Sequence, residues 1–175
     1  MKRHMMKLRI SGDLVAAWQK DLIKAGKREI GGVLFGEQIA EGDFRLVEAT
    51  RQRFGGGTRD RFHRRGRPAR KAIEVLHNIH GGDAERFNYL GEWHSHPSAP
   101  ALPSIRDQVT MFQLLADQAG AVNFLVLLIV RVNGARALEM GAAAYLASGH
   151  RIGCQIVIEA GVSIPINIQD SGETP

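Results

Sequence analysis

The chain has 175 residues, of which 44% are hydrophobic and 23% charged, and this composition indicates one globular domain rather than a disordered or fibrous protein. The single cysteine, Cys154, excludes an internal disulfide bond and favours a reducing compartment. The longest apolar run, residues 121–130, is too short to span a bilayer, and the basic N-terminus lacks the apolar stretch of a signal peptide. We therefore expect one cytoplasmic domain over residues 1–175, with its core at about 8–160 and a flexible tail at 170–175.

The first third of the chain predicts a helix followed by two strands. Ser11 can cap a helix that continues to Ala25 and ends at Gly26. Residues 30–36 form a short, apolar run with glycines, which is typical of a buried strand. Residues 44–50 alternate between apolar and polar side chains, as a half-exposed strand does.

The remainder of the chain alternates helices with strands. We expect helices at residues 69–80 and from about 104 to 118, and strands at 89–96, 124–132, 137–146 and 151–159. The dipeptide Asn133-Gly134 is a hairpin signal between two of these strands. This order predicts an α/β (α+β) fold, in which helices flank a mixed central β-sheet.

Much of the net charge of +5 is concentrated at residues 51–70, which contain eight arginines, a single acidic residue and a run of three glycines. Two interpretations stay open for this segment. It is either a solvated loop with no further role, or a docking surface for an acidic protein or for nucleic acid. Phe54 and Phe62 favour docking, because a fully solvated loop has little use for aromatic side chains.

The stretch GEWHSHPSAPALPSIRDQ, residues 91–108, carries the strongest indication of chemistry. Residues i and i+2 of a strand point to the same side, so His94 and His96 project together, while Trp93 and Ser95 face the other way. Two imidazoles on one face provide half of a tetrahedral zinc site. The H-x-H pair alone is a weak signal, because many such pairs are ordinary surface or core residues.

A third ligand and a base are available for this pair. Asp107 lies in the pattern S-x-x-D, which resembles a helix start capped by Ser104, and the Pro-rich segment before it can return that helix end over the strand. Hydrolytic zinc sites use three protein ligands and a base that manages protons. Glu29 is the best candidate base, and Gly31 and Gly32 would let substrate backbone come close. We therefore predict one zinc ion per chain at this cluster.

These residues fall into the pattern of a known family. The segment E-x-G-G-x-L-F-G at residues 29–36, followed by H-S-H-P-x(6)-S-x-x-D at residues 94–107, resembles the JAB/MPN domain with an intact JAMM metalloprotease motif. The resemblance extends from the first helix to about Leu146 and implies an MPN fold. It also implies hydrolysis of amide bonds, often isopeptide bonds to lysine, at the C-terminus of ubiquitin or ubiquitin-like proteins.

The resemblance implies a role for each residue of the motif. His94, His96 and Asp107 would bind zinc. Glu29 would be the general base and then the acid that protonates the leaving amine. Ser104 would help to stabilise the oxyanion of the tetrahedral intermediate.

The motif GEWHSHP, with the basic segment before it, is most similar to short bacterial JAB proteins encoded beside ubiquitin-like activating and conjugating enzymes in antiphage operons. One branch, from the Bil or Bub operons, cleaves a ubiquitin-like modifier from its targets, and we favour this branch. The alternative branch, associated with CBASS, releases a cyclic-nucleotide synthase from its conjugates. The implied partners are the modifier and its conjugates, with the activating and conjugating enzymes of the same operon, and no membrane.

The resemblance also gives the arginine-rich segment a role, since the body of the modifier must rest somewhere while its tail reaches the zinc. We expect Arg61, Arg64 and Arg65 to contact that body, and Gly31 and Gly32 to accept the tail. Three other classes compete: a nucleic-acid-linked relative, a noncatalytic interaction module and an enzyme that trims sulfur-carrier proteins. The complete motif argues against the noncatalytic module. The arginine-rich segment also lacks the regularly spaced aromatic residues on which proteins stack the bases of single-stranded nucleic acid, which argues against the nucleic-acid-linked relative.

Overall fold

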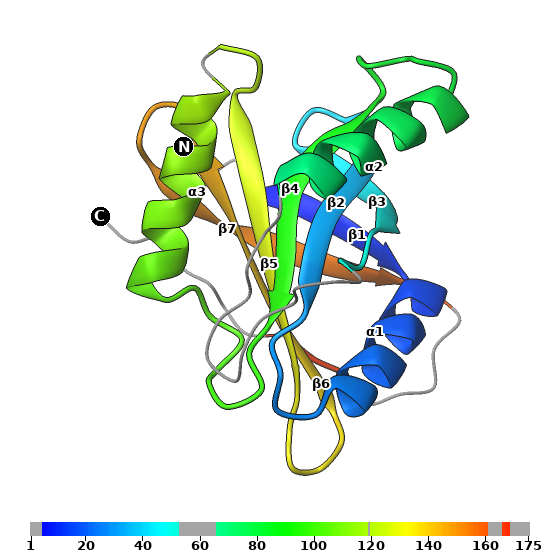
Figure 1. Ribbon diagram of the computed structural model, residues 1–175, viewed down its shortest axis with the longest axis vertical. Helices are drawn as coiled ribbons and strands as arrows, with labels where there is room; N and C mark the ends of the chain where they lie inside the picture. Colours follow the sequence, from blue (N-terminus) through cyan, green and yellow to red (C-terminus); the bar gives the residue numbers. More distant parts are fainter. Residues whose placement is uncertain (1–4, 53–65, 119, 161–165, 169–175) are drawn as a thin grey trace.

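The computed structural model describes residues 5–52, 66–118, 120–160 and 166–168, and these residues form eight strands and three helices (Figure 1). The strands are β1 (Met6–Ser11), β2 (Gly31–Ala40), β3 (Asp43–Ala49), β4 (Phe87–Ser95), β5 (Phe124–Val132), β6 (Leu138–Leu146), β7 (Arg151–Glu159) and β8 (Ile166–Ile168). The helices are α1 (Gly12–Ala25), α2 (Gly66–Ile79) and α3 (Ile105–Asp117). Within these ranges, no helix has the length and apolar character needed to cross a membrane. The predicted tail at 170–175 lies outside the described residues.

Seven of the strands close into a barrel. Their order is β5-β4-β2-β3-β1-β7-β6, and β6 pairs again with β5, which joins the two ends. β1 runs parallel to β3 and β7, β4 runs parallel to β5, and the other pairs in the ring are antiparallel. The predicted fold class, an α/β (α+β) fold with helices flanking a mixed central β-sheet, is therefore wrong. The described part of the chain is a closed barrel of mostly strands with three helices packed on it.

The sequence prediction missed two strands, β1 and the short β8, and the absence of β1 explains this error. Met6, Leu8 and Ile10 are buried and alternate with two charged residues, a period-two pattern that is short and lies in a basic terminal segment. β1 pairs with β3 on one side and with β7 on the other, so it joins the two halves of the ring. Without β1 the remaining strands give a sheet with free edges, and periodicity alone does not reveal which distant strands pair.

The other predicted elements lie within a few residues of their expected positions. Ser11 caps α1 by accepting a hydrogen bond from the N–H of Leu14, and Gly26 ends the helix with a positive φ of 61°. The hairpin between β5 and β6 is confirmed, but its loop is longer than a two-residue turn. The side chain of Asn133 accepts hydrogen bonds from two N–H groups of that loop, and Arg136 carries the positive φ.

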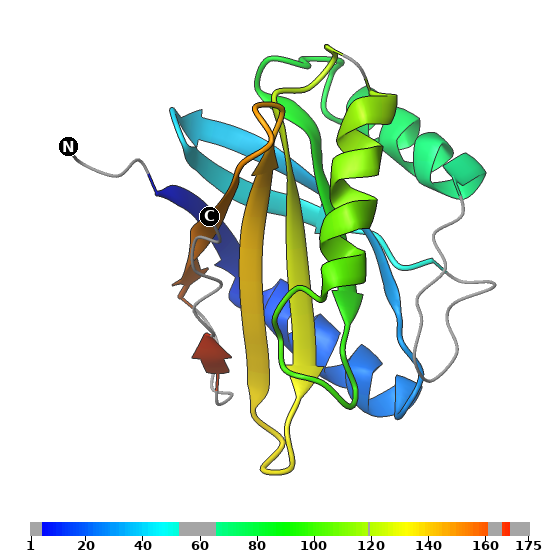
Figure 2. The same ribbon diagram turned by 90° about the vertical axis from the view of Figure 1, so that its left-hand side faces the viewer.

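Successive residues of β5 point into two separate cores. Val126, Leu128 and Val130 pack in a cluster with the apolar face of α1, which includes Trp18. Leu125, Leu127 and Ile129 point the other way, into a cluster that includes residues of α2 and α3. Figure 2 shows α3 lying along the outside of the barrel strands. This arrangement brings the N-terminus of α3 beside the last residues of β4 and β5, where the predicted site residues gather.

Candidate metal centre

The two histidines lie at the end of β4, where the strand alternation predicts them to point the same way. His94 is 9% exposed and His96 is 7% exposed. The N–H of His96 donates to the carbonyl of Val130, which extends the pairing with β5 one residue beyond the strand. The Nε2 atoms of the two imidazoles are 3.0 Å apart. Two nitrogen donors therefore face each other from stiff backbone.

Asp107 reaches the same point from the first turn of α3. A capping box starts this helix: the N–H of Asp107 donates to Ser104 Oγ at 3.2 Å, and the N–H of Ser104 donates to Asp107 Oδ2 at 2.7 Å. The carboxylate also lies 3.3 Å from His94 Nε2 through Oδ1 and 3.5 Å from His96 Nε2 through Oδ2. The helix start thus fixes the carboxylate against both imidazoles, as the S-x-x-D pattern predicted.

The electrostatics of the cluster favour a charged carboxylate. Burial opposes ionisation of Asp107, but hydrogen bonds with His94, His96 and Ser104 outweigh it, so the pKa of the carboxyl lies well below its usual range. Burial also opposes protonation of His96. Hydrogen bonding to Asp107 and to the carbonyl of Pro100 outweighs that burial and raises the pKa of His96. The Asp107 carboxylate therefore gives the cluster a negative charge, which a bound cation can neutralise.

The donor set fits a zinc ion. Nitrogen and oxygen ligands lie about 2.0–2.2 Å from zinc, so two ligands at a tetrahedral angle are separated by about 3.3–3.6 Å. The two imidazole nitrogens lie 3.0 Å apart, slightly closer than this, and the carboxylate approaches His94 at 3.3 Å through Oδ1 and His96 at 3.5 Å through Oδ2. With one ligand atom taken from each residue, all three atoms lie within 4.8 Å of one another. His96 Nδ1 lies 2.9 Å from the carbonyl of Pro100, to which it can donate, leaving Nε2 free of its proton for a metal. His94, His96 and Asp107 can therefore hold one metal ion.

Glu29 lies in the loop between α1 and β2 and is partly exposed. Its negative charge contributes to the raised pKa of His96, so the carboxylate lies within electrostatic reach of the cluster. The next residue, Ile30, forms two hydrogen bonds with Ser95, which stands between the two histidines in β4. The predicted base and the predicted ligands are thus brought together by neighbouring elements, while the catalytic role of Glu29 stays a prediction.

Gly31 and Gly32 are buried, and internal packing already requires both. A Cβ on Gly31 would lie 2.3 Å from the carbonyl oxygen of Trp93, and one on Gly32 would lie 1.8 Å from that of Thr50. This part of β2 also has partners on both sides, since Gly31 pairs with β4 and its carbonyl accepts from the N–H of Gln52. Their role in accepting a substrate tail stays a prediction, and the tail cannot add as a strand to either side of β2 at Gly31 without displacing these partners.

Sequence reasoning missed several residues that support the site. Pro100 orients His96 through its carbonyl, and Arg131 donates to the neighbouring carbonyl of Ala99 at 2.8 Å. Backbone carbonyls leave no sequence signal, so these contacts could not be found from the residue types. Ser95 could have been found, because a small polar residue between two ligands on a buried strand needs a hydrogen-bond partner. Arg61, Arg64 and Arg65 lie outside the described residues.

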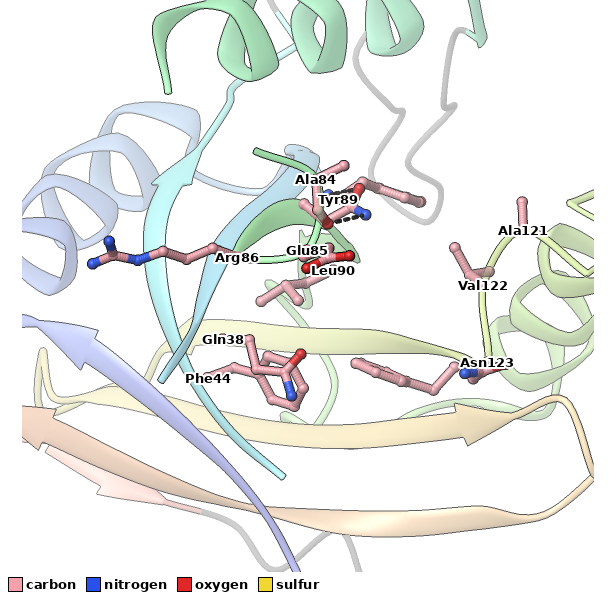
Figure 3. Close-up of a pocket in the computed structure, with 13 residues that line it drawn as sticks. Gln38, Phe44, Ala84, Glu85, Arg86, Tyr89, Leu90, Ala121, Val122 and Asn123 are labelled. Carbon is pink, nitrogen blue, oxygen red and sulfur yellow. Dashed lines mark hydrogen bonds between the residues drawn. The ribbon is translucent and has the colours of Figure 1, made fainter. Parts of the chain in front are cut away.

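A cavity of about 170 Å³ lies at the opposite ends of the same strands (Figure 3). Its lining includes the first residues of β4 and β5, whereas the metal cluster lies beside their last residues. Phe44, Leu90 and Phe124 provide apolar walls, and Gln38 and Asn123 provide amide groups. None of the predicted site residues that the structure describes lines this cavity, so it is separate from the His94, His96 and Asp107 cluster.

Comparison with known proteins agrees with the resemblance to the JAB domain. Residues 13–141 match the family model described as prokaryotic homologs of the JAB domain. The fold is similar to the solution structure of protein DSY2949 from Desulfitobacterium hafniense, with a TM-score of 0.66 over 89% of this chain and 95% of that one. The two sequences are 17% identical, so this likeness concerns the fold alone. No curated protein matches the chain.

Proposed function

Since the match over residues 13–141 makes this chain a member of the prokaryotic JAB domain family, we propose that it is a zinc-dependent isopeptidase. Its substrate is the amide bond that follows the C-terminus of a ubiquitin-like protein, in a conjugate or in a precursor. The observation that carries the proposal is the triangle of His94, His96 and Asp107, whose spacing suits zinc, with Glu29 in electrostatic reach.

Each residue has a chemical task in this proposal. His94, His96 and Asp107 hold the zinc ion, which supplies Lewis acidity to polarise the scissile carbonyl and acidify a water molecule. Glu29 accepts a proton from the attacking water through a carboxylate oxygen. As the carbon–nitrogen bond breaks, Glu29 gives that proton to the leaving amine, so the products are a free C-terminal carboxylate and an amine.

Ser104 supports the oxyanion that develops on the carbonyl oxygen. Its Oγ already accepts a hydrogen bond from the N–H of Asp107, so the hydroxyl hydrogen remains for donation to the oxyanion. The capping box that positions Asp107 therefore also fixes Ser104. One helix start provides a metal ligand and an oxyanion donor, and both move together if the cap is lost.

We further propose a biological setting from the resemblance of the motif. The modifier belongs to a bacterial ubiquitin-like conjugation pathway in antiphage defence, and the reaction takes place in the cytoplasm. The modifier and its conjugates are the partners, and the arginine-rich segment at 51–70 provides positive charge for docking them. Adjacent genes for activating and conjugating enzymes would support this setting, and a neighbouring nucleotide cyclase gene would point to the CBASS branch.

The experiment is a cleavage assay with zinc-loaded protein and aminocoumarin conjugates of ubiquitin and of bacterial ubiquitin-like proteins. We expect release of the fluorophore from at least one conjugate, and a loss of about 10²- to 10⁴-fold for Glu29→Ala with zinc content unchanged. Wild-type turnover by Glu29→Ala would overturn the mechanism. A zinc-loaded wild-type protein that cleaves none of the conjugates would overturn the proposed substrate class.

A further inference from the structure

Ser95 connects the loop of Glu29 to the strand that carries the metal ligands. It is the last residue of β4, lies between His94 and His96 and is fully buried. Its N–H donates to the carbonyl of Ile30 at 2.8 Å, and its Oγ accepts from the N–H of Ile30 at 2.9 Å. The residue before Ile30 is the proposed base.

The second of these bonds is unusual for a sheet. In an antiparallel pair of this kind, both residues exchange backbone N–H···O=C bonds. β2 and β4 pair in regular antiparallel register from Leu34 opposite Gly91 to Gly31 opposite His94. At the next position the hydroxyl of Ser95 takes the place of its own backbone carbonyl. The segment before β2 thus departs from the ladder at Ile30, the residue that directly follows Glu29.

We propose that Ser95 is the positioning residue for Glu29. The inference rests on the proposed function, since it assigns Ser95 to the geometry of the base. Its side chain points away from the ligand face of β4, so it acts through Glu29 rather than on substrate or metal. A rigid hydroxyl bridge fixes the distance between the base and the ligands, and a misplacement of about 1 Å in such a site costs about 10²-fold in rate.

The variants are Ser95→Ala, which removes the hydroxyl, and Ser95→Thr, which keeps it. The matched control is Ser11→Ala, because Ser11 Oγ also accepts a backbone N–H bond, from Leu14, but at the far end of α1 from Glu29. We expect Ser95→Ala to lower kcat by about 10- to 100-fold with KM and zinc affinity within about twofold of wild type. Ser95→Thr restores kcat, and Ser11→Ala leaves it unchanged.

A double-mutant cycle separates positioning from general support of the fold. If Ser95 acts through Glu29, then Ser95→Ala has no further effect on kcat in the Glu29→Ala background. An equal loss in both backgrounds, or a loss of zinc affinity that matches the loss of kcat, would show that Ser95 supports the barrel rather than the base. Full activity of Ser95→Ala would also overturn the inference.

Amide hydrogen exchange gives a readout that does not depend on cleavage. We expect exchange at Ile30 to accelerate about fivefold or more in Ser95→Ala, with recovery in Ser95→Thr and no change in Ser11→Ala. Unchanged exchange at Ile30 would overturn the inference even if the enzyme proved active. If the wild-type protein cleaves none of the conjugates, the proposed function fails, and exchange at Ile30 still decides whether Ser95 fixes this loop.

Discussion

Substitution of Gly32 by alanine separates a packing role for this glycine from a role in accepting substrate. The added Cβ would lie 1.8 Å from the carbonyl oxygen of Thr50, where an ordinary contact is 3.4 Å or more, so the backbone there must retreat by more than 1 Å. That oxygen accepts a hydrogen bond from Trp93 Nε1 at 2.8 Å, and Thr50 also exchanges hydrogen bonds with Val33. Displacing the Thr50 backbone therefore disrupts the hydrogen bonds that join it to Trp93 and Val33.

The cost of the Gly32→Ala change follows from these contacts. Overpacking a well-packed site costs about 1–3 kcal/mol. Leaving the indole N–H of Trp93 without a partner adds about 1–3 kcal/mol, because this side chain is 1% exposed. We therefore expect the free energy of unfolding to fall by about 2–6 kcal/mol, a large part of the 5–15 kcal/mol typical of a single domain.

Urea denaturation followed by tryptophan fluorescence measures this loss. Trp18 and Trp93 are the two tryptophans of the chain, and their buried rings lie 5.5 Å apart, so unfolding changes the environment of both. The control is Gly134→Ala, because a Cβ at Gly134 meets no atom within 4 Å, and its stability should stay within about 0.5 kcal/mol of wild type. A Gly32→Ala protein with wild-type stability but a raised KM would refute the packing argument and favour the substrate role.

Three further predictions concern the candidate site and its surroundings. Ser104→Ala should lower kcat by about 10²- to 10³-fold through loss of an oxyanion donor, as measured with the aminocoumarin conjugates, and an unchanged kcat would exclude that role. Reversal of Arg61, Arg64 and Arg65 to glutamate should raise KM for a folded modifier, most at low salt, with little effect on a short peptide of its tail; equal effects on both substrates would contradict docking. Cys154 as a whole is partly exposed, but burial of its thiol raises the pKa to about 12, so Ellman's reagent should label it more slowly in the native protein than in urea, and equal rates would contradict the raised pKa.

Local patterns in the sequence predicted the grouping of His94, His96 and Asp107 better than they predicted the fold. The alternation of a strand places His94 and His96 on one face, and the S-x-x-D pattern forms a capping box that directs Asp107 toward them. Both patterns act over a few residues, so their geometry follows from the sequence. Closure of the barrel depends on which distant strands pair, and the six-residue strand Met6–Ser11 that joins the ring gave too short a pattern.

Long-range contacts also account for what was missed around the site. Ser95 and the carbonyl of Pro100 support the predicted residues through hydrogen bonds that depend on how separate segments meet. The packing of Gly31 and Gly32 also depends on distant segments, so the sequence did not reveal it. Sequence reasoning explained Gly31 and Gly32 by substrate approach, whereas the structure shows backbone oxygens where their side chains would be.

The proposed chemistry depends on one zinc ion held by His94, His96 and Asp107. The most direct test is zinc stoichiometry and affinity, measured by elemental analysis and competition with a chelating dye, for wild type, Asp107→Asn and the triple alanine variant. We expect about one zinc per chain in wild type, binding weaker by more than about 100-fold in Asp107→Asn, and none in the triple variant. Asp107→Asn should keep the helical content of wild type, because its amide oxygen can still accept from the N–H of Ser104. Wild-type zinc content in the triple alanine variant would contradict the claim.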